Sequence, residues 1–179
     1  KSKARFKILK WGRRVGKTWL EAYTEGKWAL EKPGGKFWYV TKTLSLARDE
    51  FIPALLNILP QECVARFNEQ KLSVTLKNRS TITAKSSEKE DNLRGRGLDG
   101  LVVDEAAFLR ERIFDQILRP QLGHSKGPAI IASSAKKGWF TRLFNQAAKG
   151  DDSTHFASHA TIYDSSLDAD EIAAIKAKT

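Results

Sequence analysis

The segment that most constrains the fold is a glycine-containing turn, WGRRVGKT, at residues 11–18. It follows a short apolar run at residues 5–10 that is typical of a strand, and it leads into a periodic stretch at residues 17–31 that is typical of a helix. A strand, a glycine turn ending in Lys-Thr and a helix are together the context of a phosphate-binding P-loop. The sequence therefore predicts an anion site formed by backbone amides at the start of this helix.

Two residues at the end of this turn have distinct expected tasks. We expect Lys17 to reach the β- and γ-phosphates of a nucleotide, and the hydroxyl of Thr18 to coordinate Mg²⁺. In the usual P-loop pattern the first glycine stands where Trp11 is found, so Gly12 is displaced by one position and the loop is a variant form. The residues expected to bind ATP are Gly12, Arg13, Arg14, Val15, Gly16, Lys17 and Thr18.

A second motif lies at residues 101–105, where the apolar run LVV ends in Asp104 and Glu105. Adjacent carboxylates complete the metal shell of a P-loop enzyme: Asp104 would hold Mg²⁺ through water, and Glu105 would orient and deprotonate the attacking water. The alternative is a buried strand that happens to end in solvated acids. Both motifs in this order, with a further strand between them at residues 37–41, favour a nucleotide-hydrolysing site.

The rest of the chain alternates short apolar runs with longer periodic segments, which predicts an α/β domain with a mostly parallel central sheet flanked by helices. Central strands are expected at residues 101–104 and 129–133, and a β-hairpin insertion at residues 72–76 and 81–84 around KNRS. Helices are expected at residues 45–59 with a kink or break at Pro53, at 110–118 with Pro120 closing it, and at 168–178.

Composition limits the classes of partner. The chain has 31 Lys and Arg against 21 Asp and Glu, a formal net charge of +10, which suggests a polyanionic partner such as nucleic acid; simple solubility is the alternative. No stretch approaches the roughly 18 consecutive apolar residues of a membrane helix, so no membrane partner is expected. The single cysteine, Cys63, rules out an internal disulfide and fits a reducing cytosol. Because the chain contains no methionine, we expect it to be part of a longer protein.

Further candidates lie around these two motifs. Ser133, Ser134 and Ala135 end an apolar strand, where a hydroxyl pair could sense the γ-phosphate, although small polar residues are also ordinary turn formers. Lys136 and Lys137 are candidate contacts to DNA phosphates. The tryptophans at positions 19, 28, 38 and 139 are expected in the core.

Arginines aimed at the γ-phosphate could stabilise the charge that develops during hydrolysis. The candidates are Arg13 and Arg14 in the loop, and Arg94 and Arg96 in the segment NLRGRG, which could face a neighbouring subunit. A plain solvated loop is the alternative for that segment.

These residues together resemble the large terminase subunit of tailed bacteriophages. The resemblance rests on GRRVGKT, on LRGRG leading into LVVDEAAF, on the SSA strand end and on TIYDSSLDADEI, and it spans residues 6 to about 172. It implies an ASCE-type P-loop ATPase domain that powers packaging of double-stranded DNA into a procapsid. The family's nuclease domain is not expected in this chain, so nuclease activity is not expected either. We expect the ATPase domain at residues 1–160, and at 161–179 its end or the start of a linker.

The resemblance also implies roles and partners. Lys17 and Thr18 would be the Walker A pair, Asp104 and Glu105 the Walker B aspartate and catalytic glutamate, and residues 133–135 the coupling motif. Arg13 would contact the γ-phosphate, and Arg94 or Arg96 would act on the ATP of a neighbouring subunit. The implied partners are double-stranded DNA, copies of itself in a ring, the portal protein and the small terminase subunit, in the host cytoplasm at the procapsid portal. The glutamine with which this family contacts adenine is not visible, so base preference stays open.

Two other functions remain possible at this point. A helicase-like or repair ATPase that depends on DNA would use the same fold, and strand separation of a forked duplex would favour it. A DNA-binding module with a degenerate nucleotide site would bind DNA tightly without affinity for ATP.

Overall fold

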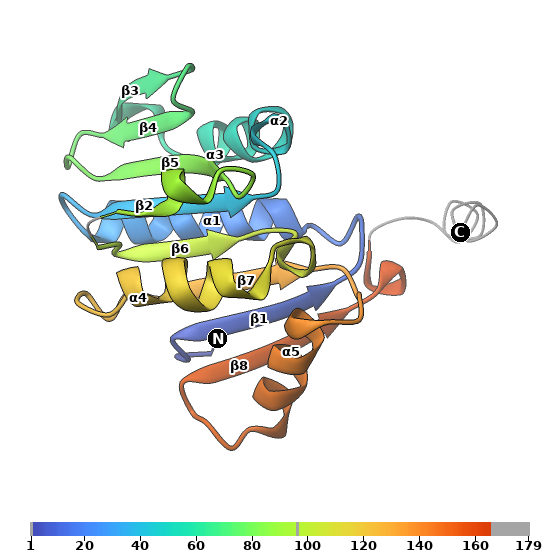
Figure 1. Ribbon diagram of the computed structural model, residues 1–179. Helices are drawn as coiled ribbons and strands as arrows, with labels where there is room; N and C mark the ends of the chain where they lie inside the picture. The colour runs from blue at the N-terminus through green and yellow to red at the C-terminus, as the bar shows by residue number, and fades with distance from the viewer. Residues whose placement is uncertain (1, 96, 166–179) are drawn as a thin grey trace.

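The computed structural model describes residues 2–95 and 97–165, which form a single sheet of eight strands in the order β3-β4-β5-β2-β6-β7-β1-β8 (Figure 1). The six neighbouring strands from β5 to β8 run parallel, and β4 runs antiparallel to both β3 and β5. The mostly parallel sheet and the inserted hairpin are thus confirmed. The strands are β1 (Phe6–Trp11), β2 (Lys36–Thr41), β3 (Val64–Asn68), β4 (Ser73–Leu76), β5 (Thr81–Ser86), β6 (Gly100–Val103), β7 (Ala129–Ser133) and β8 (His155–Ala160). The strand β3, at one edge of the sheet, was not predicted.

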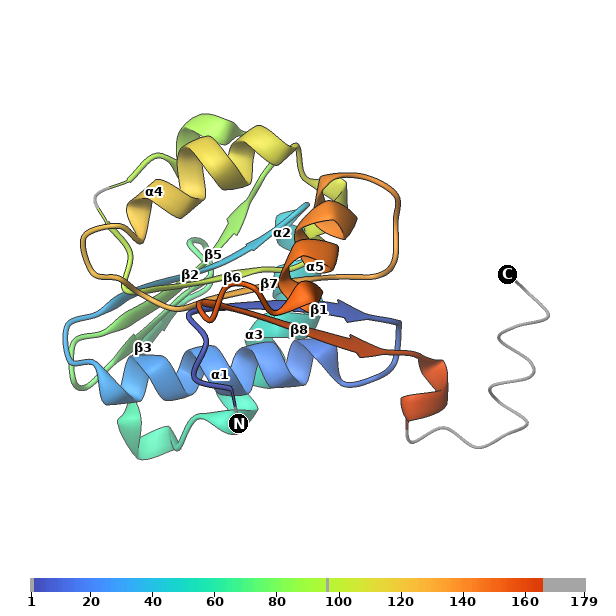
Figure 2. The same ribbon diagram turned by 90° about the horizontal axis from the view of Figure 1, so that it is seen from below.

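Helices cover both faces of the sheet (Figure 2). One face carries α1 (Lys17–Glu31) and α3 (Ile52–Ile58), which follows α2 (Leu44–Leu46) through a π-helical segment (Ala47–Phe51). The other face carries α5 (Trp139–Lys149) and α4 (Arg119–Gln121), which continues a π-helical segment (Ile113–Leu118). Short 3₁₀ turns lie at Gln61–Cys63, Glu90–Leu93, Ala106–Phe108 and Ile162–Asp164. Within residues 2–95 and 97–165, no helix has the length and apolar character needed to span a bilayer.

The alternation of side chains along the strands divides the core into two layers. In β6, Leu101 and Val103 pack into the cluster beneath α4 and α5, while Val102 packs into the cluster beneath α1 and α3. All four residues of β6 are buried, as expected for a central parallel strand covered on both faces. The apolar run before Asp104 is therefore held rigidly by neighbours on every side.

Both predicted proline effects need correction. Pro53 does not break its helix: a π-helical segment precedes it, and Pro53 lies in the first turn of α3, where a missing N–H is tolerated. Pro120 does not close its helix either, because it lies in the first turn of α4, again directly after a π-helical segment, and the helix ends at Gln121. The helix predicted at residues 168–178 lies outside the described residues.

The buried face of α1 also differs from expectation. Trp19 is 55% exposed, so its predicted place in the core is wrong. The buried face instead presents Glu21, Ala22, Glu25, Gly26 and Ala29. Small side chains there allow close packing: a methyl group added at Gly26 would lie 3.3 Å from the side chain of Leu59. Trp139, in contrast, is buried as predicted, within a helix, α5, that was not predicted.

Candidate active site

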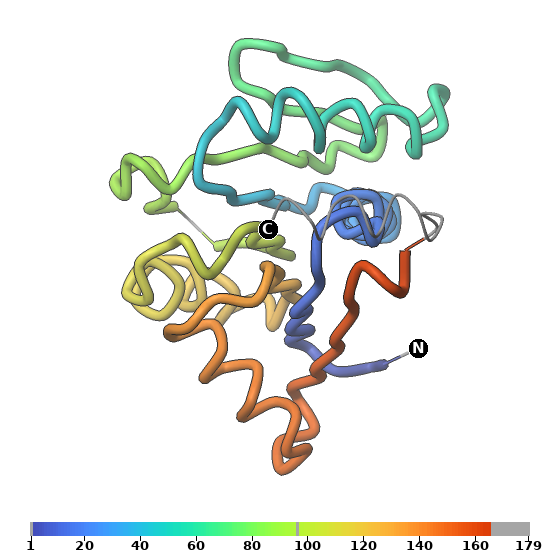
Figure 3. The backbone as a smooth tube through the Cα atoms, turned by 90° about the vertical axis from the view of Figure 1, so that its right-hand side faces the viewer, coloured from blue at the N-terminus to red at the C-terminus, as the bar shows by residue number. Residues whose placement is uncertain are grey.

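The two sequence motifs meet at the edge of the sheet where the parallel strands end, the edge that faces the viewer in Figure 3. They line one cavity of about 680 Å³. The predicted residues that line it are Gly12, Arg13, Arg14, Gly16, Lys17, Thr18, Asp104 and Glu105. Val15 of the predicted loop does not line it. This is the edge at which parallel α/β sheets place their ligands.

The turn after β1 is shaped by its backbone. Gly16 has a φ of +78° and directly precedes α1, a left-handed conformation that glycine adopts without steric cost. At the other end, the amide of Gly12 donates to the carbonyl of Ala160 (2.9 Å), and the indole N–H of Trp11 donates to Ser158 Oγ (3.1 Å). Trp11 is thus the last residue of β1 and is anchored to β8, which explains why the loop's first glycine comes one position later.

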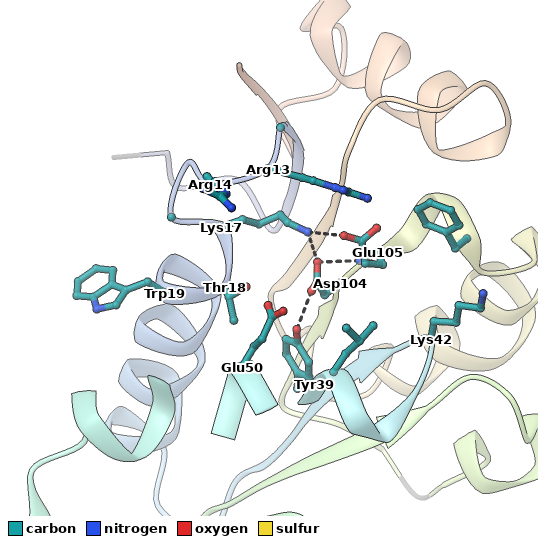
Figure 4. Close-up of a pocket in the computed structure, with 14 residues that line it drawn as sticks. Arg13, Arg14, Lys17, Thr18, Trp19, Tyr39, Lys42, Glu50, Asp104 and Glu105 are labelled. Carbon is teal, nitrogen blue, oxygen red and sulfur yellow. Dashed lines mark hydrogen bonds and ion pairs between the residues drawn. The ribbon is translucent and has the colours of Figure 1, made fainter. Parts of the chain in front are cut away.

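The ammonium group of Lys17 joins the two motifs (Figure 4). It forms ion pairs with Asp104 Oδ1 and, at 3.2 Å, with Glu105 Oε1. Burial alone would lower the pKa of Lys17, but the carboxylates of Asp104 and Glu105 outweigh that effect and raise it. Lys17 is therefore charged, and the carboxylates at the end of β6 neutralise that charge.

Asp104 is oriented by two further donors. The hydroxyl of Tyr39 donates to Oδ2 (2.8 Å), and the amide of Glu105 donates to Oδ1 (2.7 Å). Burial, together with the charge of Asp104, raises the pKa of Tyr39, so its proton stays on the hydroxyl. The backbone of Glu105 has a φ of +52°, a left-handed conformation that is uncommon for residues other than glycine. Asp104 is thus fixed by donors on both of its oxygens, next to a residue with an unusual backbone conformation.

Two buried carboxyl groups lie on α1 behind this site. Glu21 and Glu25 are fully buried, and their oxygens have no hydrogen-bond partner among the described residues. Burial raises the pKa of both well above the ordinary value, and for Glu21 the charge of Asp104 raises it further. Both groups thus favour the neutral form. Neither was singled out from the sequence, because a glutamate in an amphipathic pattern predicts an exposed position.

The predicted coupling residues have different environments. Ser133, at the end of β7, is buried, and its hydroxyl accepts a hydrogen bond from the amide of Ala107 (3.2 Å), two residues after Glu105. Ser134 is half-buried and Ala135 is exposed, and neither lines the cavity. Lys137 is exposed, and so is Lys136, whose ammonium lies 4.2 Å from the ring centroid of Phe108. Phe108 lines the cavity, so Lys136 stands at its margin.

The predicted arginines separate into two groups. Arg13 and Arg14 line the cavity; in Figure 4 Arg13 points toward Glu105, whereas Arg14 lies farther from Glu105. Arg94 does not line it: its side chain is 70% exposed and lies 3.7 Å from Asp91. Arg96 lies outside the described residues. Within one chain the structure therefore does not bring Arg94 to the cavity.

The donor set suits Mg²⁺. Thr18 and Asp104 line the same cavity, and no group of three His, Cys, Asp or Glu side chains able to hold a metal occurs among residues 2–95 and 97–165. Mg²⁺ usually takes one or two protein oxygens and completes its shell with water and substrate phosphates. One hydroxyl and one carboxylate beside the glycine turn fit this pattern.

Comparison with known proteins identifies the family. Residues 8–176 match the family described as terminase large subunit, T4likevirus-type, N-terminal. The chain belongs to this family. Terminase large subunits of Thermus phage G20c and Thermus virus P23-45 are each 35% identical to it over 72 residues, which are 40% of this chain and 15% of either relative. The matched segment is therefore a small part of those relatives.

Solved terminase structures share the fold. The ATPase domain of the Thermus phage P74-26 large terminase superposes with a TM-score of 0.78 at 20% identity, over 92% of this chain and 78% of that chain. The large terminase of another thermophilic bacteriophage superposes with a TM-score of 0.81 at 18% identity, over 97% of this chain and 45% of that chain. That second terminase has also been solved with ADP and with ATP-γ-S. The predicted P-loop NTPase fold of a terminase is thus confirmed.

Proposed function

We propose that this terminase domain hydrolyses ATP with Mg²⁺ and that hydrolysis drives double-stranded DNA into a procapsid. The observation that carries the proposal is the meeting of Lys17, Asp104 and Glu105 in one cavity beside the glycine turn, in a chain of the terminase family. A helicase-like ATPase that depends on DNA is the second candidate, but no feature of the site favours it over packaging.

Each residue of the site has a chemical task in this proposal. The amides of residues 12–18 and the ammonium of Lys17 bind the phosphates, and Glu105 takes a proton from the attacking water. Thr18 and Asp104 would hold Mg²⁺, which neutralises charge on the β- and γ-phosphate oxygens when bound. Arg13, which points toward Glu105 in Figure 4, would contact the γ-phosphate.

The ion pairs of Lys17 connect substrate binding to the general base. A triphosphate carries more negative charge than Asp104 and Glu105 together, so it competes for the ammonium group. When Lys17 turns to the phosphates, Glu105 loses a cationic partner and becomes free to accept a proton from water. Substrate binding and activation of the base are thus one event.

The coupling and assembly roles extend this proposal. Ser133, which is hydrogen-bonded to the segment that follows Glu105, would transmit the state of the γ-phosphate to β7. Ser134 and Ala135, which follow it at the end of β7, would complete this coupling motif. Lys136 and Lys137 are proposed contacts to the DNA backbone. Arg94 is proposed to act on a neighbouring subunit's ATP in a ring at the portal, in the host cytoplasm. The portal protein and the small terminase subunit are the other proposed partners.

Hydrolysis and nucleotide binding, measured separately, test the proposal. Glu105→Gln should bind ATP as the wild type does and hydrolyse it at least about 100-fold more slowly, because the general base is lost. Lys17→Ala should lose binding as well. Glu62→Gln, an exposed carboxylate far from the cavity, is the control. Binding without hydrolysis by the wild type in Mg²⁺, at every protein concentration tested, would contradict the enzymatic role.

The translocase role needs its own readout. In the full-length protein, Glu105→Gln should abolish DNA uptake into portal-bearing procapsids. Separation of a forked duplex by the wild type, without DNA uptake, would select the helicase-like function instead.

A further inference from the structure

An exposed aromatic pair stands beside the cavity at the start of α1. Trp19 is the third residue of α1, directly after Thr18, and it lines the cavity. It is 55% exposed, and Tyr23, one turn further along, is 45% exposed. The binding and catalytic roles proposed above use neither ring.

The two rings pack against each other. Their centroids are 5.4 Å apart and their planes differ by 4°, so they are stacked. Residues four apart on a helix lie on the same face, which is why α1 itself holds this arrangement. An indole fixed in this way loses little conformational freedom when a second flat ring packs against it. The pair is therefore preorganised to hold a planar ligand.

The position of Trp19 relative to the phosphate-binding groups is decisive. In Figure 4, Glu105 and Trp19 lie at opposite ends of the site, with Lys17 and Thr18 between them. A nucleotide whose γ-phosphate faces Glu105 and whose phosphates contact Lys17 must extend its base away from Glu105. The cavity at that end is bordered by Trp19.

We propose that Trp19, supported by Tyr23, is the stacking platform for the base of the bound nucleotide. This inference rests on the proposed function, since it takes the direction of the nucleotide from the role of Glu105. The face of an indole stacks on any base but reads none of its hydrogen-bonding groups. The platform therefore contributes affinity for purine nucleotides without distinguishing adenine from guanine.

Three substitutions and three ligands test the platform. Dissociation constants for ATP, GTP and inorganic tripolyphosphate are measured by calorimetry with the wild type, Trp19→Ala, Trp19→Phe and the control Leu30→Ala. Leu30 is an exposed apolar residue at the far end of the same helix. Alanine is favourable in a helix, so both alanine variants should fold.

The expected result separates base binding from phosphate binding. Trp19→Ala should weaken the binding of ATP and GTP by about tenfold, which is within the range that loss of one base–aromatic stack produces. The affinity for tripolyphosphate should stay unchanged. Trp19→Phe should recover most of the loss, and Leu30→Ala should match the wild type. ATP should also quench tryptophan fluorescence in the wild type more than in Trp19→Phe.

Results that contradict the stacking platform can be distinguished from results that contradict the proposed function. Equal ATP affinity in the wild type and Trp19→Ala would overturn the platform while leaving hydrolysis intact. An equal loss of affinity for ATP and tripolyphosphate would also overturn the platform, because the indole would then shape the glycine turn rather than bind the base. A wild type that binds none of the three ligands would overturn the proposed function and the platform together.

Discussion

The hydroxyl of Tyr39 donates a 2.8 Å hydrogen bond to Asp104 Oδ2, joining the middle of β2 to the residue that follows β6. Tyr39 is 1% exposed, and its ring stacks on Phe51 with centroids 3.7 Å apart. The carboxylate proposed to hold the metal is thus oriented by a residue of the core. Packing between β2 and the segment that contains Phe51 is transmitted directly to the site.

Tyr39→Phe should lower stability and activity without removing the fold. The ring and its stacking remain, but Asp104 loses a buried donor, and hydrogen bonds to charged groups contribute about 1.5–3 kcal/mol. We expect the free energy of unfolding in urea to fall by about 1–2 kcal/mol and the affinity for Mg²⁺ in the ATPase assay to weaken. Glu62→Gln, which changes an exposed side chain that does not line the cavity, should alter neither quantity; equal effects of both variants would refute the role of Tyr39.

Ser133→Ala should affect hydrolysis more than Ser134→Ala. The first removes the acceptor of the Ala107 amide and frees the segment after Glu105, whereas the second changes a half-buried hydroxyl that does not line the cavity. Loss of this part-buried hydrogen bond costs about 0.5–1.5 kcal/mol, so Ser133→Ala should also be the less stable variant. Steady-state hydrolysis and urea unfolding of both proteins give the comparison. A larger effect at Ser134 would point to a contact made only in the assembled motor.

Glu25→Gln should change how stability depends on pH. Because burial raises its pKa in the folded state, Glu25 binds a proton there that the unfolded chain releases above its ordinary pKa. Wild-type stability from this group is therefore full below about pH 4.5 and declines as pH rises, with a slope of up to about 1.4 kcal/mol per pH unit. Glu25→Gln removes that decline and should be the more stable protein at pH 8, with a smaller difference at pH 5.

Urea unfolding across this pH range measures the effect of Glu25. Glu31→Gln, an exposed residue of the same helix, should leave the pH dependence of the wild type unchanged. Parallel pH profiles for Glu25→Gln and the wild type would show that Glu25 is hydrated or paired in solution.

Arg94→Ala should leave the folded chain intact and reduce hydrolysis only where subunits assemble. The side chain is 70% exposed and outside the cavity, so its loss should change stability by less than about 0.5 kcal/mol. If Arg94 acts on a neighbour, mixing Arg94→Ala with Glu105→Gln should restore hydrolysis that neither variant has alone. Hydrolysis that is independent of protein concentration, with no rescue on mixing, would exclude action in trans.

Local sequence patterns predicted the scaffold of the site well. The strand, glycine turn and helix around Lys17 follow from short-range rules, and the predicted helix at residues 17–31 has the observed bounds of α1. The strand at residues 129–133 was likewise predicted with its observed bounds. Asp104 and Glu105 were placed near Lys17 because the ends of parallel strands meet at one edge.

Long-range packing decided what the sequence did not reveal. In the sequence, Tyr39 looks like any other large residue of a buried strand. Its hydroxyl reaches Asp104 only because of the register of β2 beside β6. Trp19 was expected in the core, yet the close packing of α1 buries the face that contains Ala22 and Gly26 instead. The predicted effects of Pro53 and Pro120 were wrong because no local sequence motif indicates the π-helical segment that precedes each proline.

The strand that leads into the glycine turn lies between β7 and β8, which come more than 100 residues later in the chain. During synthesis β1 emerges before β7 and β8, so both of its hydrogen-bonding edges stay open until residues 129–160 have been made. Sheets closed by such distant pairings form slowly and leave unpaired edges exposed in the meantime. The glycine turn after β1 therefore takes its final shape only after these later strands have been made, late in the folding of this domain.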